Sequence, residues 1–166
     1  EHKAAAIVTY LVPGLRFFHE GQFEGRTHRA NIHLGRRHDE SVDTELADFY
    51  RRLLAIVNDE RVRTSTFHRE ACDPAWDGNR TWHRFIAFSR RPEDGAPMLV
   101  VVNDGPTQGQ CFLRLDSPDL PQVRLRFRDR LSNAGYDRDG ADLAGRGLYL
   151  DMPAWGFHIF DVHVIA

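Results

Sequence analysis

The hydrophobic pattern of the first 60 or so residues predicts two helices with a strand and a long loop between them. Residues 3–12 are mostly apolar, and this helix-like run ends at Pro13-Gly14, because proline lacks an N–H and disfavours helix in the residue before it. A short apolar burst over 15–18 predicts a buried strand, and residues 19–42 predict a polar loop. The clearest helix is predicted over 43–58, where apolar residues recur at i, i+3 and i+4 behind Asp43 as the cap.

From about residue 62 the period changes from helical to alternating. Strong turn residues separate the apolar runs, and residues 137–140 (Asp-Arg-Asp-Gly) also predict a turn. Many short strands with turns between them are typical of an antiparallel sandwich. We therefore predict a mainly β protein with a Greek-key β-sandwich, with strands over 62–69, 80–90, 97–102, 110–115, 123–128, 147–152 and 156–164.

Two stretches resemble the α-amylase family of glycoside hydrolases. Residues 13–22, Pro-Gly-Leu-Arg-Phe-Phe-His-Glu-Gly-Gln, are similar to the last barrel strand of that family, although Arg16 stands where a second proline is usual and His19-Glu20 where two tyrosines are usual. Residues 147–155, Gly-Leu-Tyr-Leu-Asp-Met-Pro-Ala-Trp, are similar to the end of the β-sandwich that follows the barrel. The two stretches occur in the family's order, so the resemblance covers nearly the whole chain.

The resemblance implies two domains. Residues 1–60 would be the last helix, strand and helix of a (β/α)8 barrel, and residues 61–166 would be the C-terminal sandwich domain. Glu1 would then be an internal cut in a longer protein, and the remainder of the barrel would be the partner of this chain. Outside that barrel Ile7, Tyr10, Phe17 and Phe18 would expose apolar surface, so we expect the isolated chain either to self-associate or to fold this segment against its own sandwich.

The same resemblance implies that this chain is not catalytic. Retaining α-glycosidases need a carboxylate nucleophile and a carboxylic acid with a raised pKa. By resemblance these groups belong to earlier barrel strands, and the Asn-His-Asp that usually ends the set does not occur in the sequence. The expected function is structural, within an enzyme that hydrolyses or transfers α-glucosidic bonds. Substrate, linkage and the choice between hydrolysis and transfer are not predicted.

Charge and composition narrow the classes of partner. The formal net charge of −2 comes from 22 basic and 24 acidic residues, which does not indicate a nucleic-acid partner. No apolar run is long enough to span a membrane, and the first residues have no signal-peptide character, so we expect a cytoplasmic protein. Cys72 and Cys111 match no zinc or redox spacing. The preferred interpretation is that both are buried free thiols, and the alternative is a disulfide between them.

The candidate substrate-binding residues are Glu20, Gln22, Arg26 and Trp76. The first three follow the predicted last strand, at the barrel face where active sites lie. Glu20, together with Glu24, could bind sugar hydroxyls, but ion pairs with Arg16, Arg26 or Arg29 on a solvated loop are the simpler interpretation. Trp76 lies in a polar loop and could stack on a sugar ring, whereas Trp82 and Trp155 fit core positions better.

We predict no metal site and no cofactor. His28, His33 and His38 are five residues apart, which suits neither a helix face nor a strand face, and zinc needs three or four convergent ligands. The row Arg124, Arg126 and Arg128 is interpreted as a solvated sheet face. A second function from another class stays open, a free-standing carbohydrate-binding module that would use Trp76.

Overall fold

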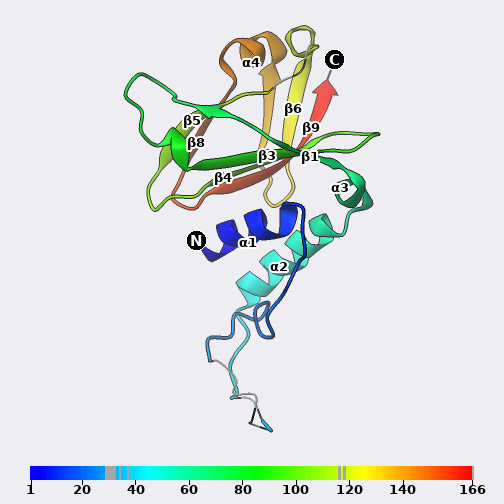
Figure 1. Cartoon of the computed structure of the whole chain (residues 1–166), viewed down its shortest axis with the longest axis vertical. Coiled ribbons are helices and arrows are strands. Elements are labelled where there is room, and N and C mark those ends of the chain that lie inside the picture. Colours follow the sequence, from blue (N-terminus) through cyan, green and yellow to red (C-terminus); the bar gives the residue numbers. More distant parts are fainter. Residues whose placement is uncertain (29–32, 34, 37, 116, 118, 166) are drawn as a thin grey trace.

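A layer of helices covers one face of a large β-sheet, and a smaller sheet covers the other face (Figure 1). The computed structural model describes residues 1–28, 33, 35–36, 38–115, 117 and 119–165. The large sheet is antiparallel throughout and has the strand order β1-β3-β4-β9-β6-β7, and the small sheet has the order β2-β5-β8. This non-sequential order confirms the predicted mainly β sandwich.

The helices begin and end where the sequence supplies capping and stop residues. α1 (His2–Leu11) ends just before Pro13, and α2 (Thr44–Val57) begins where the Asp43 side chain accepts a hydrogen bond from the amide of Leu46 at 3.0 Å. A third, short helix follows at once, α3 (Glu60–Thr64), whose cap is Asp59. The predicted helices over 3–12 and 43–58 are thus confirmed to within a residue or two.

The strands of the described residues divide between the two sheets. The large sheet contains β1 (Thr66–Arg69), β3 (Phe85–Arg91), β4 (Met98–Asn103), β6 (Arg124–Asp129), β7 (Gly135–Asp139) and β9 (Phe157–Ile165). The small sheet contains β2 (Cys72–Asp73), β5 (Gly109–Leu113) and β8 (Leu148–Met152). Two single-turn 3-10 helices, η1 (Trp82–Arg84) and η2 (Leu120–Gln122), and the helix α4 (Gly140–Arg146) connect them.

The large sheet has a hydrophobic core on each face. Every residue of β4 is buried, because its side chains alternate between the two cores. Met98, Val100 and Val102 pack with the helices, while Leu99 and Val101 pack with the small sheet. Tyr10 and Leu53 belong to the helix-side core, so α1 and α2 are held against the sheet by apolar burial.

The strand predicted over 15–18 is wrong. These residues form no strand, and none of the backbone hydrogen bonds of the described residues joins 15–18 to another strand. Leu15 is 96% exposed and Phe17 is 67% exposed. An apolar burst predicts a buried strand only where a neighbouring strand is available, and this part of the chain has none.

Three further boundaries differ from the sequence prediction. The strand expected over 62–69 begins at Thr66, because capping by Asp59 continues the helical region to Thr64. The strand expected over 80–90 begins at Phe85, after η1. The turn expected over 137–140 is the end of β7 followed directly by α4, whose cap is Asp139. In the described part of the chain, no helix combines the length and the apolar character needed to cross a bilayer.

Candidate functional site

Gln22 joins the loop after α1 to both long helices. Its amide nitrogen donates to the hydroxyls of Tyr10 and Tyr50, each at 2.7 Å, and its amide oxygen accepts from the backbone N–H of His19 at 3.1 Å. The Tyr50 hydroxyl also lies 2.7 Å from Nε2 of His2. A residue predicted to bind substrate therefore has its amide engaged in contacts within the chain.

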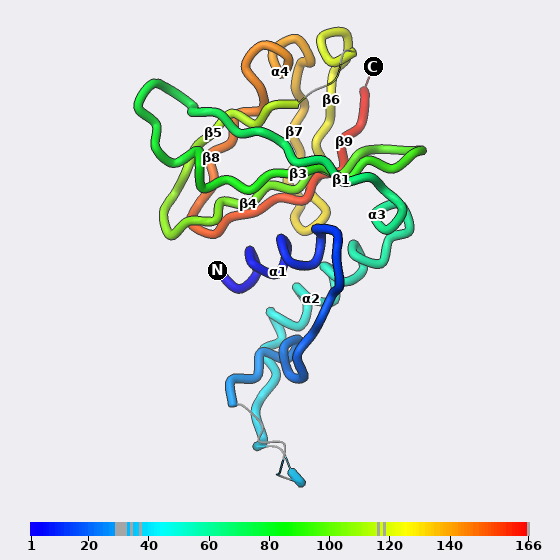
Figure 2. The backbone as a smooth tube through the Cα atoms, viewed as in Figure 1, coloured from blue at the N-terminus to red at the C-terminus, as the bar shows by residue number. Residues whose placement is uncertain are grey.

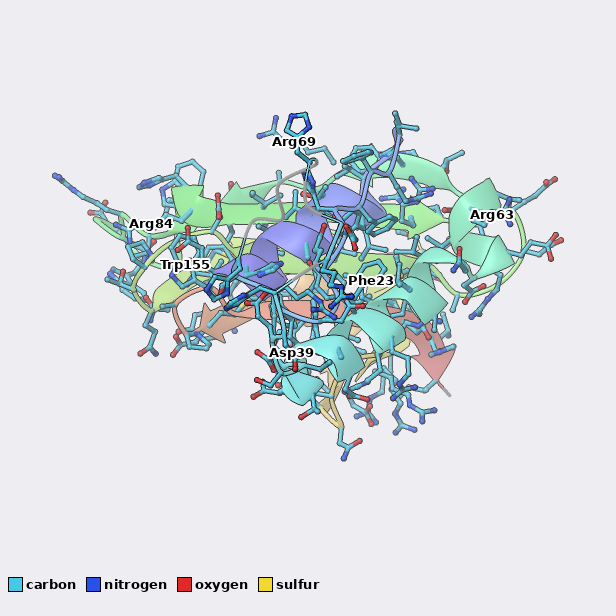
Figure 3. The ribbon with its side chains drawn as sticks, turned by 90° about the horizontal axis from the view of Figure 1, so that it is seen from below. Phe23, Asp39, Arg63, Arg69, Arg84 and Trp155 are labelled. Atoms are coloured by element: carbon cyan, nitrogen blue, oxygen red, sulfur yellow. The ribbon has the colours of Figure 1, made fainter. Side chains whose placement is uncertain are left out.

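Aromatic rings surround these hydrogen bonds. Tyr10 stacks on Phe18 with ring centroids 4.4 Å apart, and Phe23 lies 5.0 Å from the ring of Tyr50. Viewed from the helix side, Phe23 lies beside α2 (Figure 3). Burial raises the pKa of the Tyr50 hydroxyl, so this group stays neutral and acts as a hydrogen-bonding contact.

Arg26 closes the same loop onto itself. Its backbone N–H donates to the carbonyl of Gly21 at 2.9 Å, and its aliphatic stem lies so close to Gly21 that a Cβ there would be 2.8 Å from the Arg26 Cδ. Gly21 also has a positive φ of 81°, which a residue with a side chain adopts at a cost. The Nε of Arg26 is buried and has no hydrogen-bond partner among the residues that the structure describes.

The two glutamates of this loop are placed differently. Glu20 is exposed, at the start of the turn that contains Gln22. Glu24 is half-buried, and its backbone carbonyl accepts from the Asp43 amide at 3.0 Å, which ties the loop to the start of α2. Of the predicted ion-pair partners, Arg29 lies outside the described residues, and Arg16 donates from Nε to the backbone carbonyl of Tyr10 at 2.9 Å.

Trp76 lies away from the other three candidates. It is 53% exposed, in the loop between β2 and η1, which projects sideways from the sheets, whereas the segment after α1 extends away from them (Figure 2). The structure thus groups Gln22 and Arg26 in one loop and separates Trp76 from them. Trp82 and Trp155 are half-buried and pack against the two cores, and Trp155 lies beside the N-terminal end of α1 (Figure 3).

The histidines of the long loop contact an acidic residue. Nδ1 of His28 lies 2.9 Å from Oε1 of Glu40, and the rings of His28 and His38 are 4.9 Å apart. Hydrogen bonds from the His28 side chain and from the backbone of Thr27 and His28 lower the pKa of Glu40 to about 2. Among the residues with described positions, no three His, Cys, Asp or Glu side chains converge as metal ligands.

Sequence reasoning missed two surface features. Phe112 and Tyr149 are register partners on the outer face of the small sheet, with ring centroids 5.5 Å apart, and Tyr149 is 46% exposed. A polar pocket of about 450 Å³ lies where α2, the turn after β6 and the strand β9 meet. In the sequence, the alternation of Arg124, Arg126 and Arg128 indicates the exposed strand face beside this pocket. It does not show which residues lie opposite that face.

Comparisons with known proteins relate the fold to one class of enzyme. No family model matches the chain, and no curated protein matches it in sequence. The crystal structure of a noncanonic maltogenic α-amylase, AmyB, from Thermotoga neapolitana matches 99% of this chain with a TM-score of 0.68 at 14% identity. An inactive double mutant of MutB in complex with isomaltulose matches 71% of this chain at 19% identity, over 18% of the MutB chain. Its TM-score of 0.43 is too low for the likeness to carry an argument.

The likeness to the amylase concerns part of that enzyme. This chain spans 36% of the length of the amylase. At 14% identity the match establishes structure and not activity. The chain therefore has, over nearly its whole length, a fold that is found within an α-amylase.

Proposed function

We propose that this chain is a non-catalytic C-terminal part of an α-glucan-acting glycoside hydrolase or transglycosidase, in which residues 1–60 complete a (β/α)8 barrel and residues 61–166 form the sandwich behind it. The observation that carries the proposal is the match of 99% of the chain to 36% of a maltogenic α-amylase. The cytoplasmic location that we expect from the sequence remains part of the proposal.

The exposed segment after α1 supports this role. Leu15 and Phe17 project apolar side chains into solvent from a stretch that forms no backbone–backbone hydrogen bond with the described residues, between helices that are themselves well packed. Such a segment is what a barrel strand becomes when its two neighbouring strands are absent, since strand backbone needs partners on both sides in a closed barrel. The partner of this chain would be the remainder of the barrel.

The loop that follows would then lie at the catalytic face of the barrel. Loops after barrel strands form the active sites of such enzymes. The exposed carboxylate of Glu20 and the half-buried side chain of Arg26 are the groups on this loop that could contact substrate or upstream loops. Gln22 would act indirectly, by fixing the loop to Tyr10 and Tyr50.

The coding sequence upstream of the Glu1 codon tests the proposal. We expect an open reading frame that encodes the rest of a barrel, about 200 residues, with Asp and Glu at strand ends and an Asn-His-Asp roughly one helix before Glu1. We also expect the purified chain to leave maltooligosaccharides intact while the longer product cleaves or transfers them. A start codon directly before Glu1, or glucosidase activity in the chain alone, would contradict the proposal.

The aromatic surface of the small sheet favours one second function, binding of an α-glucan without catalysis. Aromatic faces stack on sugar rings, and Phe112, Tyr149 and Trp76 are partly or largely exposed. Gln110 and Gln108, which both bond to Asp151 at 2.9 Å and 2.7 Å, provide polar groups near the Phe112–Tyr149 pair. Retardation in a native gel that contains starch, lost in Trp76→Ala or Tyr149→Ala but kept in Val164→Ala, is the expected result.

A further inference from the structure

The polar pocket between α2 and the turn after β6 has an unusual set of charges. It is lined on the helix side by Arg52 and on the sheet side by Arg128 of β6 and His163 of β9. The turn after β6 adds Ser132 and Asn133. No residue of the loop that contains Gln22 lines the pocket.

Two carboxylates also line the pocket, those of Asp129 and Asp161, and each contacts another side chain of the protein. Asp129 accepts from the amides of Leu131 and Ser132 at 2.7 and 3.1 Å, and its other oxygen lies 2.5 Å from Nδ1 of His158. Arg130 is likewise engaged, since it donates to Asp59 at 2.9 Å.

Asp161 of the pocket and Asp137, which does not line it, each pair with an arginine. Asp161 lies 3.8 Å from Nε of Arg130, and on the neighbouring strand Asp137 is held by a bidentate pair with Arg126, both bonds being 2.7 Å. Each acidic side chain near the pocket therefore has a basic partner, and the remaining basic groups are in excess.

Two guanidinium groups stay without an acidic partner. Among the described residues, neither Arg52 nor Arg128 forms a salt bridge. The one hydrogen bond of Arg52 goes to the backbone carbonyl of Arg130 at the long distance of 3.5 Å. Ser132 accepts from the amide of Ala134 through its Oγ, which leaves the hydroxyl proton available to a ligand.

From this arrangement we infer that the pocket binds a phosphate group, presented by inorganic phosphate or by a sugar phosphate. Arginine forks match the oxygens of phosphate in bidentate geometry, and two of them balance the charge of a dianion. Arg52 and Arg128 supply that charge from opposite walls, while Ser132 and Asn133 supply neutral donors from the turn. The available volume of about 450 Å³ admits a phosphate with a single sugar ring attached.

Titration calorimetry on the full chain at low ionic strength tests the inference, with inorganic phosphate, glucose 1-phosphate, glucose 6-phosphate and glucose as separate ligands. We expect saturable binding of the phosphates and none of glucose. The variants Arg52→Gln and Arg128→Gln should each weaken phosphate binding by about tenfold or more, because each removes a charged fork. Arg128→Lys should fall between the wild type and Arg128→Gln, since it keeps the charge and loses the fork.

Arg124→Gln is the matched control. Arg124 is exposed on the same face of the same strand and does not line the pocket. Its removal lowers the net positive charge as much as Arg128→Gln does, so unchanged phosphate affinity in Arg124→Gln supports a specific site. Equal losses in the two variants, or no saturable phosphate binding, would overturn the inference. Tighter binding of a sugar phosphate than of inorganic phosphate identifies the sugar phosphate as the ligand, and equal binding identifies phosphate itself.

Discussion

Gln22 shows which contacts of a residue a local sequence pattern leaves unpredicted. The loop pattern marked it as a substrate contact, but its amide bonds to Tyr10 and Tyr50, which lie 40 residues apart in the sequence. Nothing in the local pattern says that these two hydroxyls meet, because the contact depends on how α1 and α2 pack. The exposure of Trp76, by contrast, follows from its polar loop and was predictable.

Removal of the Gln22 amide should destabilise the fold. In Gln22→Ala the hydroxyls of Tyr10 and Tyr50 lose a donor in a partly buried place, and unsatisfied groups of this kind cost about 1–3 kcal/mol. We expect the free energy of unfolding in urea to fall by about that amount. Gln108→Ala, which removes an exposed amide bonded to Asp151, is the control and should change it by less than about 0.5 kcal/mol.

The two cysteines should differ in reactivity. Both are free; Cys111 is buried in the sandwich core, and Cys72 is half-buried on the neighbouring strand. The hydrogen bond between the two thiols lowers the pKa of Cys72 and raises that of Cys111. A thiol reagent should therefore label Cys72 first in the folded chain, and Cys111→Ala should move the labelling midpoint of Cys72 to higher pH. Faster labelling of Cys111 would contradict this ordering.

At the scale of elements, the sequence predicted the helices and strands that are specified by a local pattern of residues. The apolar stripe and Asp43 define α2, and the alternation of apolar residues with arginine defines β6. The segment 15–18 could not be predicted, because whether an apolar burst becomes a strand depends on a neighbour elsewhere. The sequence did not predict β7 and α4, because Asp139-Gly140 is typical of a turn, whereas in the structure Asp139 caps a helix.

The acid stability of the helix layer should depend on Asp59. This residue caps α3 through the Arg61 amide and bonds to Arg130, which joins the helix layer to the turn after β6. The Arg61 side chain, followed by Arg130 and the Arg61 amide, lowers the pKa of Asp59 to about 2. Since the folded pKa is below the ordinary value, the stabilisation is present above about pH 4 and is lost as the pH falls through about 2.

Asp59→Asn measures this contribution. We expect it to lower the free energy of unfolding by about 1–2 kcal/mol at pH 7, because the charge that bonds to Arg61 and Arg130 is lost while the amide oxygen can still cap the helix. The difference should become progressively smaller as the pH approaches 2. Asp104→Asn, at an exposed turn, should differ little from the wild type at any pH. A constant difference between Asp59→Asn and the wild type from pH 7 to pH 2 would exclude the carboxylate charge as the cause.

At the scale of the whole molecule, the sandwich was predictable and the packing of the helices on it was not. The spacing of turns and short apolar runs is enough to indicate two antiparallel sheets. The sequence left open whether Ile7 and Tyr10 would be exposed, and the structure buries both in the helix-side core. Within residues 1–28, the large apolar side chains that stay exposed are those of Leu15 and Phe17, in the segment after α1.

This segment should govern association of the isolated chain. We expect concentration-dependent oligomers in analytical ultracentrifugation, because the exposed apolar side chains of Leu15 and Phe17 are open to a second copy. Leu15→Ser together with Phe17→Ser should shift the chain to a monomer. Val164→Ser is the control, since Val164 is 67% exposed at the far end of the large sheet. A monomeric wild type at all concentrations, or the same effect from Val164→Ser, would contradict the expectation.

The burial of the large sheet on both faces has a consequence for anyone who recombines this protein with another. A graft that starts at residue 61 would take the two sheets and leave the helices behind. Water would then reach five side chains that the helix-side core now covers, Phe88, Met98, Val100, Val102 and Ile159. A transplantable module must therefore begin before α1, so the useful cutting point in a chimera lies upstream of the boundary at which the sequence changes from helix to strand.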